Sequence, residues 1–217
     1  MSIFGRPSVK EQQQKVREDA ILDATHALLA RKGFDLMTVD DVASEAGVAK
    51  ASLYKHFDSK DALAAMVMIR LLDRALEHLR ALPADTPAGE KLESLLRWAL
   101  QLRLEGGLPL LPSTSLALRD GLLRNRPYVQ RILQLNDEMS RLIEAAKAQG
   151  ALTLSLPTDV ILFTIYARTC DPSVDYLKMT GQYDDEQITE HLVQAAFDGV
   201  RTHRAQGGRG PRAGAAA

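Results

Sequence analysis

Apolar residues recur at every third or fourth position along most of this 217-residue chain. Between residues 87 and 106, for example, Leu92, Leu95, Leu96 and Ala99 follow one another at this spacing. Such a spacing places apolar side chains on one face of a helix, where they can pack against a core. Proline is scarce inside these runs, and alternation of β-branched with polar residues is almost absent. The pattern therefore predicts an all-α protein.

Capping residues predict where the first helices begin. Ser8 with Glu11, and Thr38 with Asp41, have the spacing of a capping box, in which two side chains and two backbone N–H groups satisfy one another. We therefore expect one helix that begins after Ser8 and ends at Gly33, and a second that begins after Thr38.

Residues 38–60 predict two short helices joined by a tight turn. Gly47 can adopt the positive φ that often ends a helix. A second helix, from about residue 50 to residue 57, then directs Leu53 and Phe57 inward. A short helix, a glycine turn and another short helix are typical of the helix-turn-helix motif.

The second of these helices has the chemistry of a surface that binds a polyanion. No carboxylate occurs from residue 46 to residue 57. Cations, hydroxyl groups and an imidazole, which contact phosphate oxygens and base edges, are present instead. They belong to Lys50, Ser52, Tyr54, Lys55, His56 and Lys60. The alternative is that the lysines only solvate a surface helix; the tight turn and the absence of acids favour a DNA-binding face.

The run AGVAKASLYKHFDSKDAL resembles the signature of TetR-family transcriptional regulators, and the similarity extends back through ILDATHALLARKGFDLMTVDDVA. It covers roughly residues 15 to 65. The resemblance implies an N-terminal three-helix helix-turn-helix domain, followed by a helical domain that binds a ligand and dimerises. It also implies DNA contacts from Thr38, Lys50, Ala51, Ser52, Tyr54, His56 and Lys60. Ala49 departs from the pattern where a Ser often caps the recognition helix, and Ala51 departs where Gly is frequent.

The charge of the N-terminal region is segregated rather than basic overall. Residues 1–62 carry nine Lys/Arg and ten Asp/Glu, and the whole chain has a net charge of −1. A basic patch can nevertheless bind DNA without a basic total. In the arm formed by residues 1–8, Arg6 is a candidate for the minor groove; the alternative is a flexible tail with no contact. We expect residues 9–58 to form the DNA-binding domain.

Residues 59–204 are expected to form a helical domain for ligand binding and dimerisation, followed by a disordered tail at 205–217. The segment 158–167 is apolar on every face, which predicts burial on two sides, one of them against a second copy. A helix from Asp184 onward carries small residues that allow close approach. The predicted homodimer interface comprises Ile161, Ile165, Ile188, Leu192, Ala195, Ala196 and Gly199.

A ligand pocket is expected among large apolar and aromatic side chains on facing helices. The candidates are Trp98, Leu102, Met139, Phe163 and Tyr166. Arg103, Arg168 and Asp171 are candidates to orient a polar end of the ligand. Ordinary core packing is the alternative for each of these residues.

Composition excludes several other classes of protein. The sequence is 46% hydrophobic, yet no apolar run reaches the roughly 18 residues that predict a membrane span, and the polar N-terminus does not resemble a signal peptide. We therefore expect a cytoplasmic protein. Cys170 is the only cysteine, so no internal disulfide or cysteine-built metal site is expected; a small buried hydrophobe and a redox sensor remain alternatives for it. No cofactor is expected.

Three functions follow from these observations. The first is a repressor that binds a pseudo-palindromic operator as a dimer and is released by an apolar or aromatic small molecule. The second is an architectural or partner-recruiting DNA-bound protein without such an effector. The third is an enzyme, which the lack of GxSxG, HExxH and phosphate-loop motifs disfavours.

Overall fold

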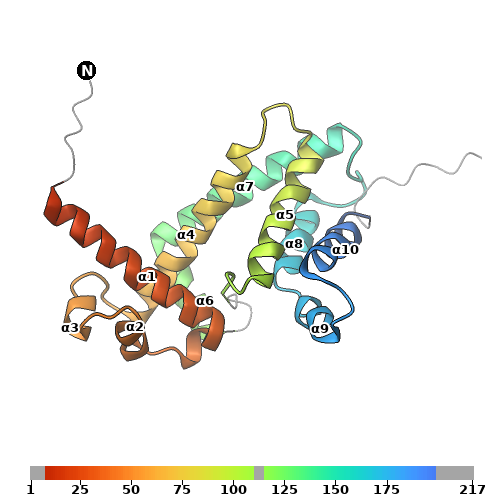
Figure 1. Ribbon diagram of the computed structural model, residues 1–217. Coiled ribbons are helices and arrows are strands. Elements are labelled where there is room, and N and C mark those ends of the chain that lie inside the picture. Colours follow the sequence, from red (N-terminus) through yellow and green to blue (C-terminus); the bar gives the residue numbers. More distant parts are fainter. Residues whose placement is uncertain (1–7, 110–114, 199–217) are drawn as a thin grey trace, which may run out of the picture.

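The computed structural model describes residues 8–109 and 115–198, and within these ranges the chain forms ten helices (Figure 1). They are α1 (Val9–Leu36), α2 (Val39–Glu45), α3 (Lys50–Leu53), α4 (Lys60–Ala81), α5 (Ala88–Leu104), α6 (Leu116–Arg124), α7 (Arg126–Ala148), α8 (Thr158–Thr169), α9 (Ser173–Thr180) and α10 (Asp185–Asp198). The prediction of an all-α protein is confirmed.

Helices α1, α2 and α3 pack with the first half of α4 and form an N-terminal head around its own hydrophobic core. Ile21, Leu28, Val42, Leu53 and Leu63 are all buried there. These residues come from four helices, so the core fixes α3 against α1 and α4. Both predicted capping boxes form and set the starts of α1 and α2.

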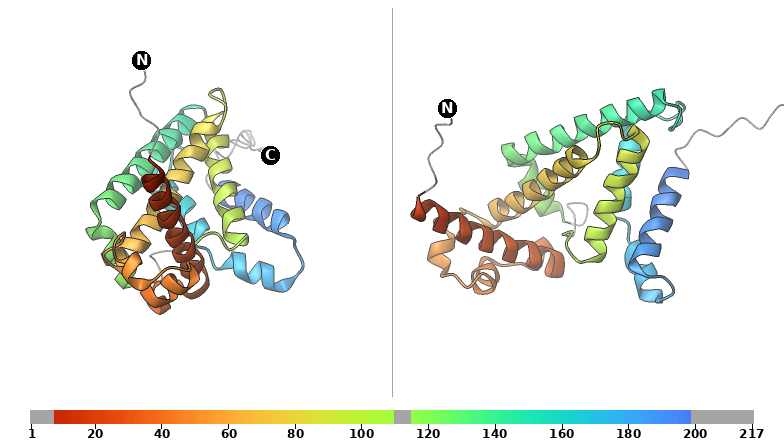
Figure 2. Two further views of the ribbon diagram at one scale, coloured as in Figure 1. Left: turned by 60° about the vertical axis from the view of Figure 1, so that its left-hand side comes forward. Right: turned by 45° about the horizontal axis from the view of Figure 1, so that its top comes forward.

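A second core lies between the second half of α4 and helices α5, α7, α8 and α10. Its buried residues include Leu76, Leu92, Met139, Ile161 and Phe197. Helices α4 and α7 run alongside each other for much of their length, and α5 stands between α4 and α8 (Figures 1 and 2). This arrangement separates the head from α9 and α10, which lie at the opposite end of the molecule.

Helix α4 belongs to both cores. Leu63 and Val67 are buried in the head, whereas Leu76 and Leu79 are buried in the second core. Because α4 begins directly after the recognition segment, any tilt of α4 within the second core must move the head. Helix α6 also packs at the start of α4, where Gly121 lies so close to Asp61 that a Cβ there would sit 3.1 Å from a carboxylate oxygen.

Several local predictions need correction. The recognition helix ends at Leu53 and not at residue 57. The chain continues from Tyr54 as a hydrogen-bonded turn, in which the N–H groups of Lys55 and His56 bond to carbonyls three residues back. Gly33, with φ of 73°, interrupts α1 but does not end it. At α5, the sequence Thr86-Pro87 predicts a Thr cap with Pro87 at the first helical position; instead Pro87 is the residue before that position, and no side chain caps the helix.

Helix α9 was not predicted from the pattern. Its eight residues bury only Val174, so no repeated apolar spacing marks this segment as a helix. Pro172 before it and Gly181 after it, with φ of 63°, are the local signals that mark its ends. Among the described residues, no helix is both long enough and apolar enough to cross a membrane.

Candidate DNA-binding face and apolar cavity

The turn between α2 and α3 has the predicted geometry. Thr38 Oγ1 accepts the N–H of Asp41 at 3.1 Å, and the Asp41 carboxylate accepts the N–H of Thr38 at 3.0 Å. Gly47 adopts φ of 64°, and the N–H of Val48 bonds to the Ala43 carbonyl at 3.0 Å. The turn therefore holds α3 at a fixed angle to α2, and Leu53 anchors it to the core of the head.

The outer surface of α3 and its turn is open to solvent. Ala51, Tyr54 and Lys55 are exposed, and Ser52 is half-buried. No side-chain hydrogen bond caps α3 at Ala49, as expected from the loss of a Ser at that position. The N–H of Ser52 instead donates to the Ala49 carbonyl at 2.8 Å within the first turn.

Lys50 is paired with a carboxylate that the sequence places ten residues away. Its ammonium lies 2.8 Å from an Asp40 oxygen, and both side chains are at least half exposed. The hydrogen bond to Asp40 raises the pKa of Lys50 above its usual range. The face that is free of acids in sequence is therefore not free of acids in space, which corrects the expectation of a purely cationic surface.

His56 faces the inside of the head and not the expected DNA side. Its side chain is only 10% exposed, and Nδ1 lies 3.0 Å from a carboxylate oxygen of Glu18 on α1. Hydrogen bonds from Gln14 and then from His56 lower the pKa of Glu18. The geometry indicates that His56 holds the recognition segment against α1.

Lys60 also has partners within the head. Its ammonium donates to the carbonyls of Phe34 at 2.8 Å and Met37 at 3.0 Å, and it lies 4.2 Å from the centroid of the Phe34 ring. These bonds tie the start of α4 to the end of α1. Thr38 is exposed beside them. Arg6 lies outside the described residues.

A cavity of about 440 Å³ lies within the second core, between α4, α5, α7 and α8. Four of the five predicted ligand residues line it, namely Trp98, Met139, Phe163 and Tyr166. Leu102 does not line it, because its side chain is buried in the core of the head. The spacing of α5 placed Leu102 on the correct face of the helix but could not show that the two cores divide that face.

Polar lining residues of the cavity were missed in the sequence. Asn136 and Tyr128 on α7 both line it, and the Tyr166 hydroxyl donates to Asn136 Oδ1 at 2.8 Å. Burial raises the pKa of both tyrosines, so both phenols are neutral near pH 7. Asn136 lies three residues before Met139 on the predicted apolar stripe of α7, which is the only signal that could have identified it.

The charged candidates for the ligand site lie outside the cavity. Arg103 donates to the Thr169 carbonyl at 3.0 Å and to Asp175 at 2.8 Å, and Arg168 pairs with Asp171 at 2.6 Å. Burial opposes the charge of Asp171, but hydrogen bonds from Ser173 and the nearby arginines lower its pKa overall. None of these three charged residues lines the cavity.

Cys170 is half-buried and lines the cavity beside Thr169, whose hydroxyl oxygen lies 3.7 Å from its sulfur. Among the described residues, no cluster of His, Cys, Asp and Glu has the arrangement of a metal site.

The predicted dimer residues mostly face the core of a single chain. Ile161, Ile165, Ile188, Leu192 and Ala196 are buried without any partner, so these side chains cannot form a surface for a second copy. Of the predicted set, Ala195 is exposed, and Gly199 lies outside the described residues.

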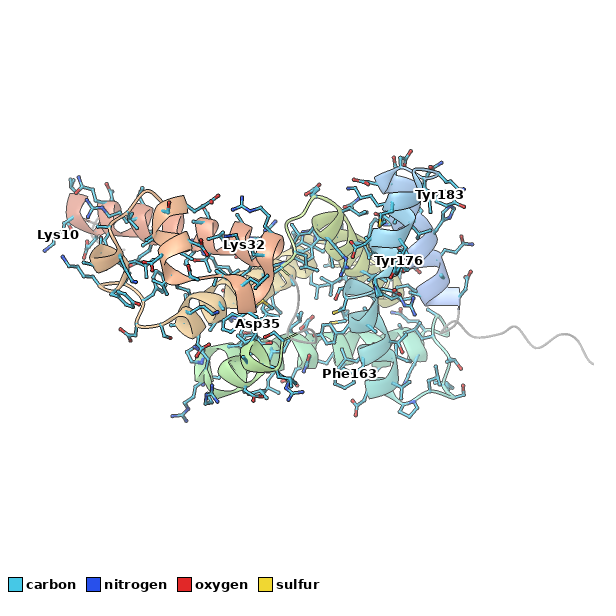
Figure 3. The ribbon with its side chains drawn as sticks, turned by 90° about the horizontal axis from the view of Figure 1, so that it is seen from below. Lys10, Lys32, Asp35, Phe163, Tyr176 and Tyr183 are labelled. Carbon is cyan, nitrogen blue, oxygen red and sulfur yellow. The ribbon has the colours of Figure 1, made fainter. Side chains whose placement is uncertain are left out.

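The outer face of α8 carries apolar residues that are exposed to solvent in the single chain. Val160 and Phe163 are exposed at helical spacing with Ala167, and the side chain of Phe163 is 62% exposed. Phe163, Tyr176 and Tyr183 lie along the end of the molecule that is far from Lys10 on α1 (Figure 3). Of the segment predicted to be apolar on every face, Ile161 and Ile165 thus face the core, and Val160, Phe163 and Ala167 face outward.

Two hydrogen bonds connect the loop between α5 and α6 to α1. The His26 ring nitrogen Nε2 is hydrogen-bonded to the Gly107 carbonyl, and Ser115 Oγ donates to Asp35 at 2.9 Å. Leu108, next to Gly107, lines the cavity. The same short loop therefore contacts both the ligand space and the head.

Comparisons with known proteins agree with this geometry. The family model "Bacterial regulatory proteins, tetR family" matches residues 21–67, which contain α2, α3 and the start of α4. The uncharacterized HTH-type transcriptional regulator YdeS of Bacillus subtilis is 28% identical over 186 residues, covering 84% of this chain and 88% of that protein. The biofilm operon icaADBC negative transcriptional regulator IcaR of Staphylococcus aureus is 46% identical, but only over 46 residues, 21% of this chain and 25% of its own.

Solved structures share the whole architecture. A TetR-family transcriptional regulator from Rhodococcus sp. superposes with a TM-score of 0.65 at 27% identity, covering 85% of this chain and 98% of that one. The fatty acid degradation regulator FadR from Bacillus halodurans gives a TM-score of 0.67 at 19% identity, covering 92% and 100% of the two chains, and this likeness concerns the fold alone.

The fold and the recognition segment together define a DNA-binding helix-turn-helix protein. The chain belongs to the TetR family of transcriptional regulators, whose members are not enzymes.

Proposed function

We propose that this protein is a repressor that binds a pseudo-palindromic operator as a homodimer and is released by a small molecule bound in the cavity. The single observation that carries the proposal is that α4 forms a wall of the 440 Å³ cavity through Leu71, Leu72 and Ala75 and also forms part of the core of the head. A ligand that displaces α4 would therefore reposition α3.

The direction of the effect follows from the geometry of DNA. A dimer reads two half-sites only when its two recognition helices match the repeat of the major groove. A ligand that binds better to a different spacing opposes DNA binding by the difference in its affinities for the two states, typically about 1 to 3 kcal/mol. The bonds from the α5–α6 loop to His26 and Asp35 provide a second connection between the cavity and the head.

The proposed dimer interface is the outer face of α8, with Val160, Phe163 and Ala167, together with the exposed side of α10 at Ala195. Exposed apolar residues at helical spacing favour packing of this face against the same face of a second copy. Light scattering at micromolar concentration should give twice the chain mass of 23.8 kDa. Val160→Glu with Phe163→Glu should shift the particle to the mass of a single chain.

For the DNA-binding residues we propose direct contacts from Thr38, Lys50, Ala51, Ser52, Tyr54 and Lys55, and a supporting role for His56 and Lys60. Selection from random duplexes should return a site with two inverted half-sites. On that site, the logarithm of the binding constant should fall with the logarithm of salt concentration with a slope of about −5 or steeper, if six or more phosphates are neutralised. A slope near zero would contradict the proposal.

Regulation is tested by thermodynamic linkage on the same site. A true effector must bind more weakly when the operator is saturated, by the same factor by which it weakens operator binding. A compound that stabilises the fold but binds equally well with and without operator is not an effector. If no small molecule changes operator affinity, an architectural or partner-recruiting role without a small-molecule effector would be favoured.

A further inference from the structure

The cavity carries polar groups but no charge. Among the described residues that line it, none is Lys, Arg, His, Asp or Glu. A buried carboxylate or ammonium without a counter-ion is strongly disfavoured in an apolar site. The lining therefore discriminates against charged ligands.

Two arginines contact lining residues but cannot neutralise an anion inside the cavity. The Arg74 guanidinium lies 5.7 Å from the centroid of the Trp98 ring, and its side chain is exposed on the surface. Arg103 is bound to the Thr169 carbonyl and to Asp175. Arg103 is therefore already paired with a carboxylate, and it does not line the cavity.

The polar groups that do reach the cavity suit one neutral hydrogen-bonding group. Asn136, which lines the cavity, accepts from Tyr166 through Oδ1, and no described residue accepts a hydrogen bond from its amide nitrogen. Within the described part of the chain, the Tyr128 hydroxyl has no hydrogen-bond partner, although the residue is half-buried in the same wall. The Thr169 hydroxyl is already used, because it donates to the Tyr166 carbonyl at 2.8 Å.

We infer that the cavity selects an uncharged ligand: a mostly hydrocarbon molecule with one hydrogen-bonding group, such as a ketone, an ester, an alcohol or a diarylamine, that lies against Asn136 and Tyr128. This inference rests on the proposed function, because it names the chemical class of the effector. Acids with a free carboxylate and ligands with phosphate groups are excluded by the same argument.

Two dyes with one skeleton test the inference directly. N-phenyl-1-naphthylamine is neutral, and 8-anilinonaphthalene-1-sulfonate differs from it by one sulfonate. Trp98 is the only tryptophan in the chain and lines the cavity, so energy transfer from it reports binding at this site. We expect the neutral dye to bind full-length protein at least tenfold more tightly than the anionic dye.

A substitution that fills the cavity provides the site control. Ala99 lines the cavity, and Ala99→Phe should abolish energy transfer to the neutral dye. Ala75→Phe, on the opposite wall formed by α4, serves as a second filling variant if the first does not fold. Circular dichroism establishes that each variant is helical before dye binding is measured.

Two variants at position 136 test whether the absence of a cation is what excludes anionic ligands. Asn136→Lys places a cation in the wall, whereas Asn136→Leu removes the same hydrogen bond to Tyr166 without adding charge. Binding of the anionic dye should rise at least tenfold in Asn136→Lys and stay weak in Asn136→Leu. Equal weak binding in both variants would mean that missing charge is not what excludes anions, and the inference would be overturned.

The hydrogen-bonding group is tested by competition against the neutral dye. We expect 2-decanone to displace the dye at lower concentration than either decane or decanoate. Tyr128→Phe and Asn136→Leu should reduce the preference for the ketone over the alkane. If decanoate displaces the dye best, the ligand class is wrong.

The outcomes separate the inference from the proposed function. If the anionic dye binds as tightly as the neutral one and both are lost in Ala99→Phe, the cavity is a ligand site but not one for neutral molecules, so only the inference fails. If neither dye binds, or if neither responds to Ala99→Phe and Ala75→Phe, the cavity does not accept ligands. In that case the inference and the effector-controlled part of the proposed function both fail.

Discussion

The two hydrophobic cores are built from the same kinds of side chain but are filled differently. In the head, Leu53, Leu63 and Ala64 have no exposed surface. In the second core, the side chains of α4, α5, α7 and α8 surround about 440 Å³ of space. None of the described residues of α1, α2 or α3 lines that space.

This difference matches the different tasks of the two regions. The head must present α3 at one angle, because DNA offers a groove of fixed dimensions, and tight packing makes such an angle rigid. The second core must admit another molecule and respond to it, which needs space and a wall that can move. Helix α4 belongs to both regions, because its first half packs in the rigid head and its second half lies in the second core.

The largest expected effect on stability comes from truncating Leu53, which anchors α3 in the core of the head. Leu53→Ala should lower the free energy of unfolding by about 3 to 5 kcal/mol, because it removes a fully buried side chain from a core that cannot easily collapse. Leu96→Ala, in the cavity wall, should cost less, because one side of Leu96 faces open space and makes fewer contacts. Urea unfolding of both variants checks the order, and a larger loss for Leu96→Ala would refute the difference in packing.

Adding side-chain volume should also destabilise the head more than the second core. Ala64→Phe in the head should cost about 1 to 3 kcal/mol or more by overpacking. Ala99→Phe should cost less than about 1 kcal/mol, because the added ring enters the cavity. Denaturant midpoints measured with unchanged m-values would establish this contrast. Similar losses at both positions would mean that the second core has no usable space.

Substitutions on the exposed face of the head should change DNA binding and leave both cores intact. Lys50→Ala should weaken binding to the selected operator about tenfold and alter base preference, if the ammonium reaches a base edge. Asp40→Asn, which removes the carboxylate paired with Lys50, should strengthen binding to all duplexes by a smaller factor. Fluorescence anisotropy on specific and random DNA distinguishes the two variants. Equal losses for Lys50→Ala on both DNAs would remove Lys50 from the base-reading residues.

The smallest effect at neutral pH concerns the tyrosine in the cavity wall. Burial raises the pKa of Tyr166 above that of an exposed phenol. Above about pH 10 the unfolded chain therefore releases a proton that the folded chain keeps, and the stability present below that pH is lost as the pH rises. Tyr166→Phe should reduce this alkaline loss of stability, which urea unfolding at a series of pH values above about 10 would measure. An identical alkaline profile for Tyr166→Phe and the parent would contradict the assignment.

Much of the head could be predicted from the sequence because its determinants are local. The capping boxes at Ser8 and Thr38 join residues three positions apart. Gly47 favours a turn because glycine readily adopts the positive φ that the turn requires. Amphipathic spacing likewise identified the inward residues of α5, since positions three or four apart share a helix face. These features do not depend on how the helices pack together.

The tertiary structure alone decided the rest. Asp40 meets Lys50 across ten residues and Glu18 meets His56 across 38, so these pairs exist only because α1, α2 and the recognition segment pack together. The sequence of α8 is apolar on all sides and could not show which side faces the core. The cavity and its uncharged lining come from residues on four helices, and its volume is the space that their packing leaves unfilled. In an amphipathic helix, sequence periodicity determines which residues are buried. Which other helix each buried face contacts is decided only when the helices pack together.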